Sequence, residues 1–153
     1  MVEPLANKHT VQIMADCNSN QSIRGDKVLI EQCLLNLFKN AIESMEDGGT
    51  LTICLNNQMD KLIIDIIDTG IGMSEEQLRK IGKPFYSTKG DKGTGLGLMT
   101  TFNIIKRMNG DIHLASKLGV GTTFTLSFPV IDDKKPINTK LNESNENGIL
   151  LKI

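Results

Sequence analysis

The stretch "KLIIDIIDTGIGM", residues 61–73, joins an apolar run to an acidic turn that contains two glycines. In an extended strand the side chains alternate between two faces, so Ile64, Ile66 and Asp68 share one face. This run therefore predicts a strand with one buried face, and Asp68 continues that face at the strand's end.

An ionised carboxylate on an apolar face needs a hydrogen-bond donor. For Asp68, the exocyclic amine of an adenine ring would be a suitable donor, and the glycines at 70 and 72 would let backbone approach a ligand. The alternative interpretation is an ordinary turn aspartate at the end of a strand.

The segments around this run are predicted helices and strands, several of them with recognisable end signals. Asp26 is placed to cap a long helix, Gly48 and Gly49 to end it, and Ser74 with Gln77 forms a capping box. Runs of antiparallel strands interrupted by helices predict an α+β fold, a two-layer sandwich with helices on one face of the sheet. The predicted elements are a strand over 9–17, a helix over 25–49, strands over 50–57 and 60–68, a helix over 74–82, a glycine-rich loop over 83–95, a helix over 96–110 and strands over 111–117 and 122–130.

Composition narrows the function classes. A chain of 153 residues predicts one domain, over 1–130, and the charged, Asn-rich segment 131–153 predicts a flexible tail. The formal charge of −1 and the absence of a membrane-length apolar run predict neither a nucleic-acid partner nor direct membrane contact. The three cysteines lack metal-site spacing, which fits a cytoplasmic domain.

Two asparagines in the long predicted helix need a reason, because asparagine is a poor helix former. Asn36 and Asn40 are four residues apart and so share a face. Amide oxygens are ligands suited to Mg²⁺, which keeps several waters and takes further ligands from phosphates. The alternative is a pair of hydrogen-bonded polar residues under a loop.

A glycine-rich loop, with Gly90, Gly93, Gly95 and Gly97, runs directly into the last predicted helix. Backbone amides and the helix dipole can hold phosphate there. The sequence contains neither the GxxxxGK[ST] pattern nor GxGxxG after a strand, so the two common phosphate-loop fingerprints are absent. A mobile surface loop would have the same composition.

The last predicted strand places Thr122, Phe124, Leu126 and Phe128 on one face. Thr122 could therefore stand in the core beside Asp68 and share a ligand or a water with it. The alternative is an ordinary glycine turn before a strand.

Five segments occur in a diagnostic order: "NLFKNA", "DTGIGM", "PFYSTK", "GTGLGL" and "GVGTTF". They resemble the N, G1, F, G2 and G3 boxes of sensor histidine kinases, and residues 11–129 resemble their ATP-binding catalytic domain. "NAIESM" with "PFYSTK" is similar, more loosely, to sporulation and nitrogen-regulation kinases. The resemblance implies the Bergerat fold, a mixed and mostly antiparallel sheet backed by helices, with ATP held between helices and sheet.

The resemblance also implies roles for individual residues. Asp68 would bind adenine, Asn40 would bind the Mg²⁺ that bridges the phosphates, and Asn36 and Asn40 would form the catalytic pair. Lys92 is a further candidate for phosphate contact. The implied ATP-binding residues are Asn36, Lys39, Asn40, Asp68, Gly70, Gly72, Met73, Phe85, Ser87, Thr88, Lys89, Gly93, Thr94, Gly95, Leu96, Gly97, Leu98 and Thr122.

One position separates subfamilies. Hydrolytic relatives and serine kinases of this group carry Glu where Asn36 stands, to activate water or a hydroxyl. A neutral imidazole already offers a lone pair, so Asn36 favours transfer to histidine. Many histidine kinases have Lys-Tyr where Glu43 and Ser44 stand, so phosphate contact from that point departs from the family pattern.

The phosphoacceptor is the missing part. Neither His9 nor His113 lies in the sequence context of a dimerisation helix. We therefore expect the partner to be the dimerisation and phosphoacceptor domain of the same kinase, absent from this chain, with a response regulator reached indirectly and the full-length kinase open to membrane anchoring. The alternatives are a serine kinase or ATPase of the same fold and a nucleotide-binding adaptor module.

Overall fold

The structure is a computed structural model that describes residues 2–19, 21–81, 96–131 and 149–152. Its elements are α1 (Glu3–Lys8), β1 (Val11–Cys17), β2 (Ser22–Gly25), α2 (Lys27–Glu43), β3 (Gly49–Gln58), β4 (Lys61–Asp68), α3 (Glu75–Lys80), α4 (Leu96–Arg107), β5 (Asp111–Lys117), β6 (Gly121–Pro129) and β7 (Ile149–Lys152).

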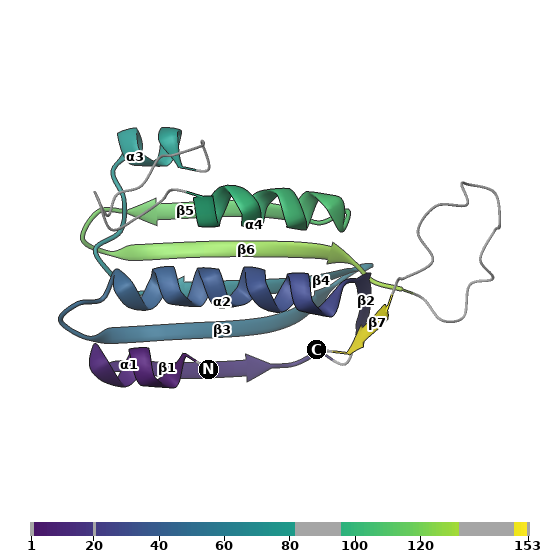
Figure 1. Ribbon diagram of the computed structural model, residues 1–153, viewed down its shortest axis with the longest axis horizontal. Coiled ribbons are helices and arrows are strands. Elements are labelled where there is room, and N and C mark those ends of the chain that lie inside the picture. The colour runs from purple at the N-terminus through teal and green to yellow at the C-terminus, as the bar shows by residue number, and fades with distance from the viewer. Residues whose placement is uncertain (1, 20, 82–95, 132–148, 153) are drawn as a thin grey trace.

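Five strands form one mixed sheet in the order β1-β3-β4-β6-β5. β1 pairs with β3 in parallel, and the other neighbours in this sheet pair antiparallel. Figure 1 shows α1, α2 and α4 on the same face of this sheet, with the ladder of β2 and β7 beyond one end. The predicted α+β sandwich, mostly antiparallel with helices on one face, is confirmed.

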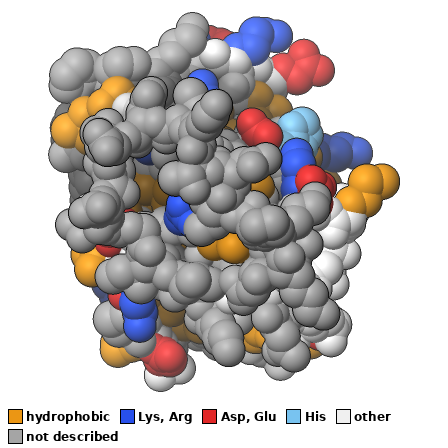
Figure 2. Space-filling model, turned by 90° about the vertical axis from the view of Figure 1, so that its right-hand side faces the viewer, with side chains coloured by type: hydrophobic (Ala, Val, Ile, Leu, Met, Phe, Trp, Pro, Cys, Tyr) orange, Lys and Arg blue, Asp and Glu red, His pale blue; other side chains and the backbone are white. Residues whose placement is uncertain are grey.

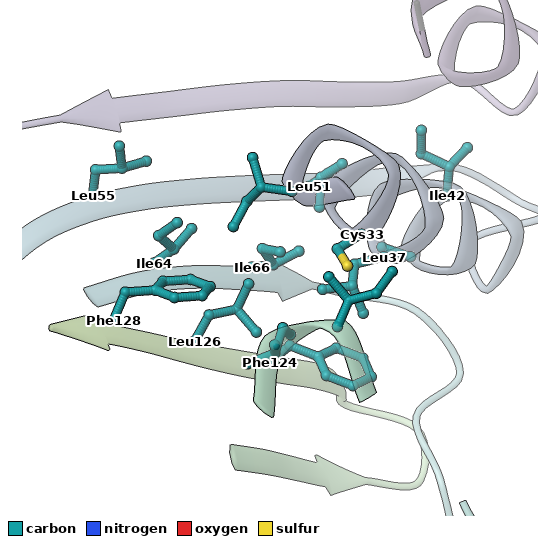
Figure 3. Close-up of a cluster of buried hydrophobic side chains, with 14 of the residues drawn as sticks. Cys33, Leu37, Ile42, Leu51, Leu55, Ile64, Ile66, Phe124, Leu126 and Phe128 are labelled. Carbon is teal, nitrogen blue, oxygen red and sulfur yellow. The ribbon is translucent and has the colours of Figure 1, made fainter. Parts of the chain in front are cut away.

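The hydrophobic core lies between the sheet and the helices. Leu62, Ile64 and Ile66 of β4 are buried on the face toward the helices, and Asp68 continues that buried row. On β6, Phe124, Leu126 and Phe128 fill the same layer, as the alternation predicted. Figure 3 shows the labelled side chains of β4 and β6 in one layer with Cys33 and Leu37 of α2. Burial of this apolar area is the main force that holds α2 on the sheet.

The start of α2 follows its sequence signal, but its end does not. Asp26 Oδ1 accepts hydrogen bonds from the backbone N–H groups of Val28 and Leu29, at 2.9 and 3.3 Å. The helix ends at Glu43 with Ser44 as C-cap, so the expected end at Gly48 and Gly49 was wrong. Gly48 has φ +94° and forms the turn that returns the chain to the sheet.

Three elements were not expected from the sequence. α1 is only six residues long, too short for a helical period to stand out. β2 and β7 are four residues each and pair with one another, although they lie near opposite ends of the sequence. Neither strand therefore has a local sequence pattern that predicts it. The remaining tail residues, 132–148, lie outside the described part, and the boundary after residue 130 stays a prediction.

Where Figure 2 colours the described side chains, basic and acidic ones lie interspersed. In the described part of the chain, no helix combines the length and the apolar character needed to cross a membrane.

Two leucines test the core. Leu37→Ala removes a side chain that is 0% exposed, and we expect the unfolding free energy to fall by about 2–5 kcal/mol. Leu118→Ala changes a side chain that is 64% exposed, and we expect a change within about 0.5 kcal/mol. Chemical denaturation of both variants measures the difference, and equal losses would contradict this packing.

Candidate functional site

The site is built around Asp68, the last residue of β4, which is only 5% exposed. Its Oδ1 accepts hydrogen bonds from the backbone N–H of Gly70 at 2.9 Å, the backbone N–H of Thr122 at 3.2 Å and the hydroxyl of Ser44 at 3.3 Å. No donor among the described residues lies on Oδ2. Because those residues include no fully buried side-chain oxygen without a partner, Oδ2 is not completely enclosed. The carboxylate is thus held by one oxygen and presents the other.

Burial raises the pKa of Asp68, and the hydrogen bonds from Gly70, Thr122 and Ser44 lower it in part. A raised pKa in the folded state means that Asp68 favours folding most below its ordinary pKa. That advantage is lost as pH rises through the raised value. Above that raised value the ionised carboxylate costs stability, which is typical of a residue kept for function.

Thr122 lies directly opposite Asp68 in the pairing of β4 with β6. Its Oγ1 is 2.9 Å from Ser116 Oγ, which also lies 2.9 Å from the carbonyl oxygen of Gly121 and 2.9 Å from the backbone N of Met73. When Ser116 donates its single proton to the Gly121 carbonyl, Thr122 donates to Ser116. Thr122 then keeps only acceptor capacity toward the site, like Asp68 Oδ2.

Glycines let the loop after β4 lie directly on its neighbours. A Cβ on Gly70 would collide with the hydroxyl oxygen of Ser44, and a Cβ on Gly72, at φ +64°, would collide with the carbonyl oxygen of Lys117. The loop is fixed further by Ile71, whose N–H donates to the carbonyl oxygen of Ser44 at 3.0 Å. These contacts are with protein neighbours, so the expected role of the two glycines, backbone approach to a ligand, stays a prediction.

Helix α2 carries a second row of polar residues. Asn36, Asn40 and Ser44 are spaced by four residues and span about 12 Å along one side of the helix. Asn36 Nδ2 donates to Thr101 Oγ1 on α4 at 3.0 Å. A Cβ on Gly97 would lie 2.6 Å from Asn36 Oδ1, so glycine at this position lets α4 approach while Asn36 keeps its present side-chain position.

A hollow of about 280 Å³ separates the start of α4 from α2. Its lining is mixed: Gln32, Cys33, Asn36, Leu96, Gly97, Thr100, Thr101 and Ile104. A larger groove of about 370 Å³ lies between α3, α4 and β5, is lined mainly by apolar side chains, and is separate from Asp68. The polar groups described above, not the larger groove, mark the candidate site.

The other predicted residues fall into two sets. Asn40 is half-buried, Lys39 is exposed with its Nζ 3.8 Å from Glu43 Oε1, and Leu98 packs against the core. Leu96 begins α4 and is partly exposed. The expected residues Phe85, Ser87, Thr88, Lys89, Lys92, Gly93, Thr94 and Gly95 lie outside the described residues.

Sequence reasoning missed two hydroxyls. Ser116 could have been found from alternation, since it shares the inward face of β5 with Ile112 and Leu114. Ser44 carried a weaker signal, because its contact with Asp68 depends on where α2 ends, and that end was misplaced.

Comparison with known families agrees with this geometry. The family model described as "Histidine kinase-, DNA gyrase B-, and HSP90-like ATPase" matches residues 25–132. Sporulation kinase A of Bacillus subtilis is 48% identical over 107 residues, which cover 70% of this chain and 18% of that protein. The sensor histidine kinase ZraS of Escherichia coli is 35% identical over 131 residues, 85% of this chain and 28% of that protein. The chain thus spans only a small part of these relatives.

Solved structures show the same fold. The nucleotide-free catalytic domain of histidine kinase ThkA has a TM-score of 0.73 at 28% identity, with 84% of each chain covered. Full-length ShkA in complex with AMPPNP has a TM-score of 0.74 at 25% identity, with 84% of this chain and 27% of that chain covered.

Gly72 and Gly119 both have positive φ, and comparing their alanine variants tests the packing of the loop after β4. Gly119 has φ +75° and open space around its Cβ position, so Gly119→Ala should cost about 1–2 kcal/mol of unfolding free energy from backbone strain alone. Gly72→Ala adds a collision with the Lys117 carbonyl, and we expect about 1–3 kcal/mol more. Thermal unfolding compares the two, and an equal loss would show that the loop does not rest on the β5–β6 turn.

Proposed function

The chain belongs to the histidine kinase-, DNA gyrase B- and HSP90-like ATPase family, and we propose that it is the ATP-binding catalytic domain of a sensor histidine kinase. The observation that carries the proposal is the buried Asp68 carboxylate, held through Oδ1 by two backbone amides while Oδ2 is left for a ligand. The likeness to sporulation kinase A and to histidine kinase catalytic domains supports the same proposal.

The base-binding end presents acceptors. Asp68 Oδ2 would accept a hydrogen bond from the exocyclic amine of adenine, and Thr122 Oγ1 would accept from a water or the base beside it. Guanine and hypoxanthine carry an oxygen at that ring position, and two acceptors facing each other are unfavourable. The site therefore selects adenine over both.

The residues present also fit a triphosphate with Mg²⁺. The Asn40 amide oxygen would hold the ion, which would supply charge neutralisation on the phosphates. The start of α4 would place backbone N–H groups toward phosphate oxygens, with Leu96, Gly97 and Leu98 at that end. Lys39 is exposed one residue before Asn40 and would add positive charge. The glycine-rich segment 93–95 and the residues of "PFYSTK" would complete the ATP contacts.

The contact made by Asn36 bears on the type of reaction. Its amide group donates to Thr101 Oγ1 and has no basic lone pair, so it would not remove a proton from water. A neutral histidine imidazole needs no such base. The γ-phosphoryl group would pass to a histidine on a dimerisation domain, and from there to a response regulator. The relatives are longer sensor kinases, which leaves room for that domain and for a membrane anchor elsewhere in the protein.

Asp68→Asn tests whether Asp68 recognises adenine through a hydrogen bond. The amide oxygen of the asparagine can accept the hydrogen bonds that Oδ1 now accepts. Its NH₂ group takes the place of Oδ2 and presents a donor to the ligand where Oδ2 presented an acceptor. We expect binding of a non-hydrolysable ATP analogue to weaken by roughly tenfold or more, while the inosine analogue weakens less. Calorimetric titration of both analogues gives the ratio.

Asp65→Asn is the matched control. Asp65 lies on the opposite face of the same strand and accepts from Thr125 Oγ1 at 2.6 Å. We expect this variant to keep the affinity and selectivity of the wild type. An equal loss of affinity for the ATP and inosine analogues in Asp68→Asn would refute recognition of adenine by Asp68.

Phosphotransfer gives a separate test. With γ-labelled ATP and Mg²⁺ we expect no label on this chain alone, and acid-labile label on a separately supplied dimerisation domain of a sporulation kinase. Asn40→Ala should reduce the rate of labelling by about tenfold or more, because a charge-assisted contact is lost. Acid-stable label, or steady ATP hydrolysis without an acceptor, would favour a serine kinase or ATPase instead.

A further inference from the structure

Ser44 occupies an unusual place beside Asp68. It is the C-cap of α2, and its backbone N–H points back to the carbonyl oxygens of Asn40 and Ala41, each at 3.1 Å. Its own carbonyl oxygen accepts from Ile71 N–H. The backbone of Ser44 is therefore fixed on both sides, and its side chain projects from a rigid point.

The hydroxyl of Ser44 has one proton and two acceptors. Its Oγ lies 2.7 Å from the carbonyl oxygen of Ala41 and 3.3 Å from Asp68 Oδ1. Ala41 O is a neutral acceptor, whereas the ionised carboxylate is a charged and stronger one. The hydroxyl occupies the space that Gly70 leaves by having no Cβ, so it is held within reach of both acceptors.

Among the described donors to Asp68, Ser44 alone uses a side chain. The amides of Gly70 and Thr122 belong to the backbone and are present whatever side chains stand there. The described neighbours that act on the Asp68 carboxyl include no charged side chain.

Within the described residues, the elements packed against Asp68 contribute no counter-charge either. On α2, Lys39 and Glu43 form an ion pair with each other at 3.8 Å. β3 places Leu51 opposite Asp68 on one side, and β6 places Thr122 opposite it on the other.

We propose that Ser44 is a positioning residue that holds the Asp68 carboxylate ionised and turned with Oδ2 toward the nucleotide base. The inference rests on the proposed function for the role of Asp68, but the contact between Ser44 and Asp68 can be measured without any nucleotide. The position where many histidine kinases carry Tyr here carries a hydroxyl that acts through the aspartate instead of on the ligand.

This role has a direction in pH. A hydrogen bond to the ionised form lowers the pKa of Asp68 and opposes the effect of burial. Without the hydroxyl, Asp68 becomes protonated at higher pH and loses its acceptor. The acid limb of ATP affinity therefore moves to higher pH in Ser44→Ala.

The experiment compares wild type, Ser44→Ala and Ser127→Ala. Ser127 lies half-buried on β6, on the face away from the helices, and serves as the matched serine control. Carboxyl carbon NMR of the nucleotide-free protein follows the titration of Asp68, whose signal is identified by its loss in Asp68→Asn. Calorimetry with a non-hydrolysable ATP analogue between pH 5 and 8 follows affinity.

We expect Ser44→Ala to move the Asp68 titration and the acid limb of ATP affinity upward by the same amount, with affinity on that limb lower by roughly three- to tenfold. Ser127→Ala should match the wild type in both measurements. In an Asp68→Asn background, Ser44→Ala should add no pH dependence, because the titrating group is gone.

An Asp68 titration that is the same in Ser44→Ala and wild type would overturn the proposal, whatever happens to affinity. A wild-type protein that binds no ATP analogue would instead overturn the proposed function, and the NMR titration would still decide the role of Ser44.

Discussion

The constraint on which the site depends is a single carboxylate at the end of a buried apolar row. Asp68 stands where the alternation of β4 would place another aliphatic side chain, so its charge must be met by donors from the surrounding backbone. The donors come from the loop that follows it and from the neighbouring strand. That requirement brings the loop, the β5–β6 turn and the end of α2 to one place.

The glycines follow from the same constraint. The N–H of Gly70 reaches Asp68 Oδ1 in a local turn that lies directly against Ser44, where a Cβ on Gly70 would collide. Gly72 in turn lies against the Lys117 carbonyl, and Gly121 against the carbonyl of Asp68. "DTGIGM" and "GVGTTF" are therefore two halves of one packing arrangement, although about fifty residues separate them.

Much of this could be predicted from the sequence because it depends on local rules. Alternation placed Asp68 and Thr122 on the buried face, and Asp26 marked the start of α2. The end of α2 could not be predicted in the same way, because Ser44 ends the helix through contacts with a loop distant in the chain. β2 and β7 depend on one another, so no local pattern revealed them. Asn36 shares the polar face as predicted, but its contact with Thr101 depends on how close α4 lies.

Helix α2 connects the two ends of the candidate site mechanically. At one end Ser44 contacts Asp68 on β4, and at the other Asn36 contacts Thr101 on α4, about 12 Å away along the same helix. Leu37 of the same helix is buried in the core, so α2 cannot slide toward one end of the site without disturbing tight packing. The distance between the two ends of the candidate site is therefore fixed by α2. Since α4 is joined to α2 through the contact of Asn36 with Thr101, a shift of α4 would alter the end of the candidate site near Asn36 and leave the contacts of Asp68 in place.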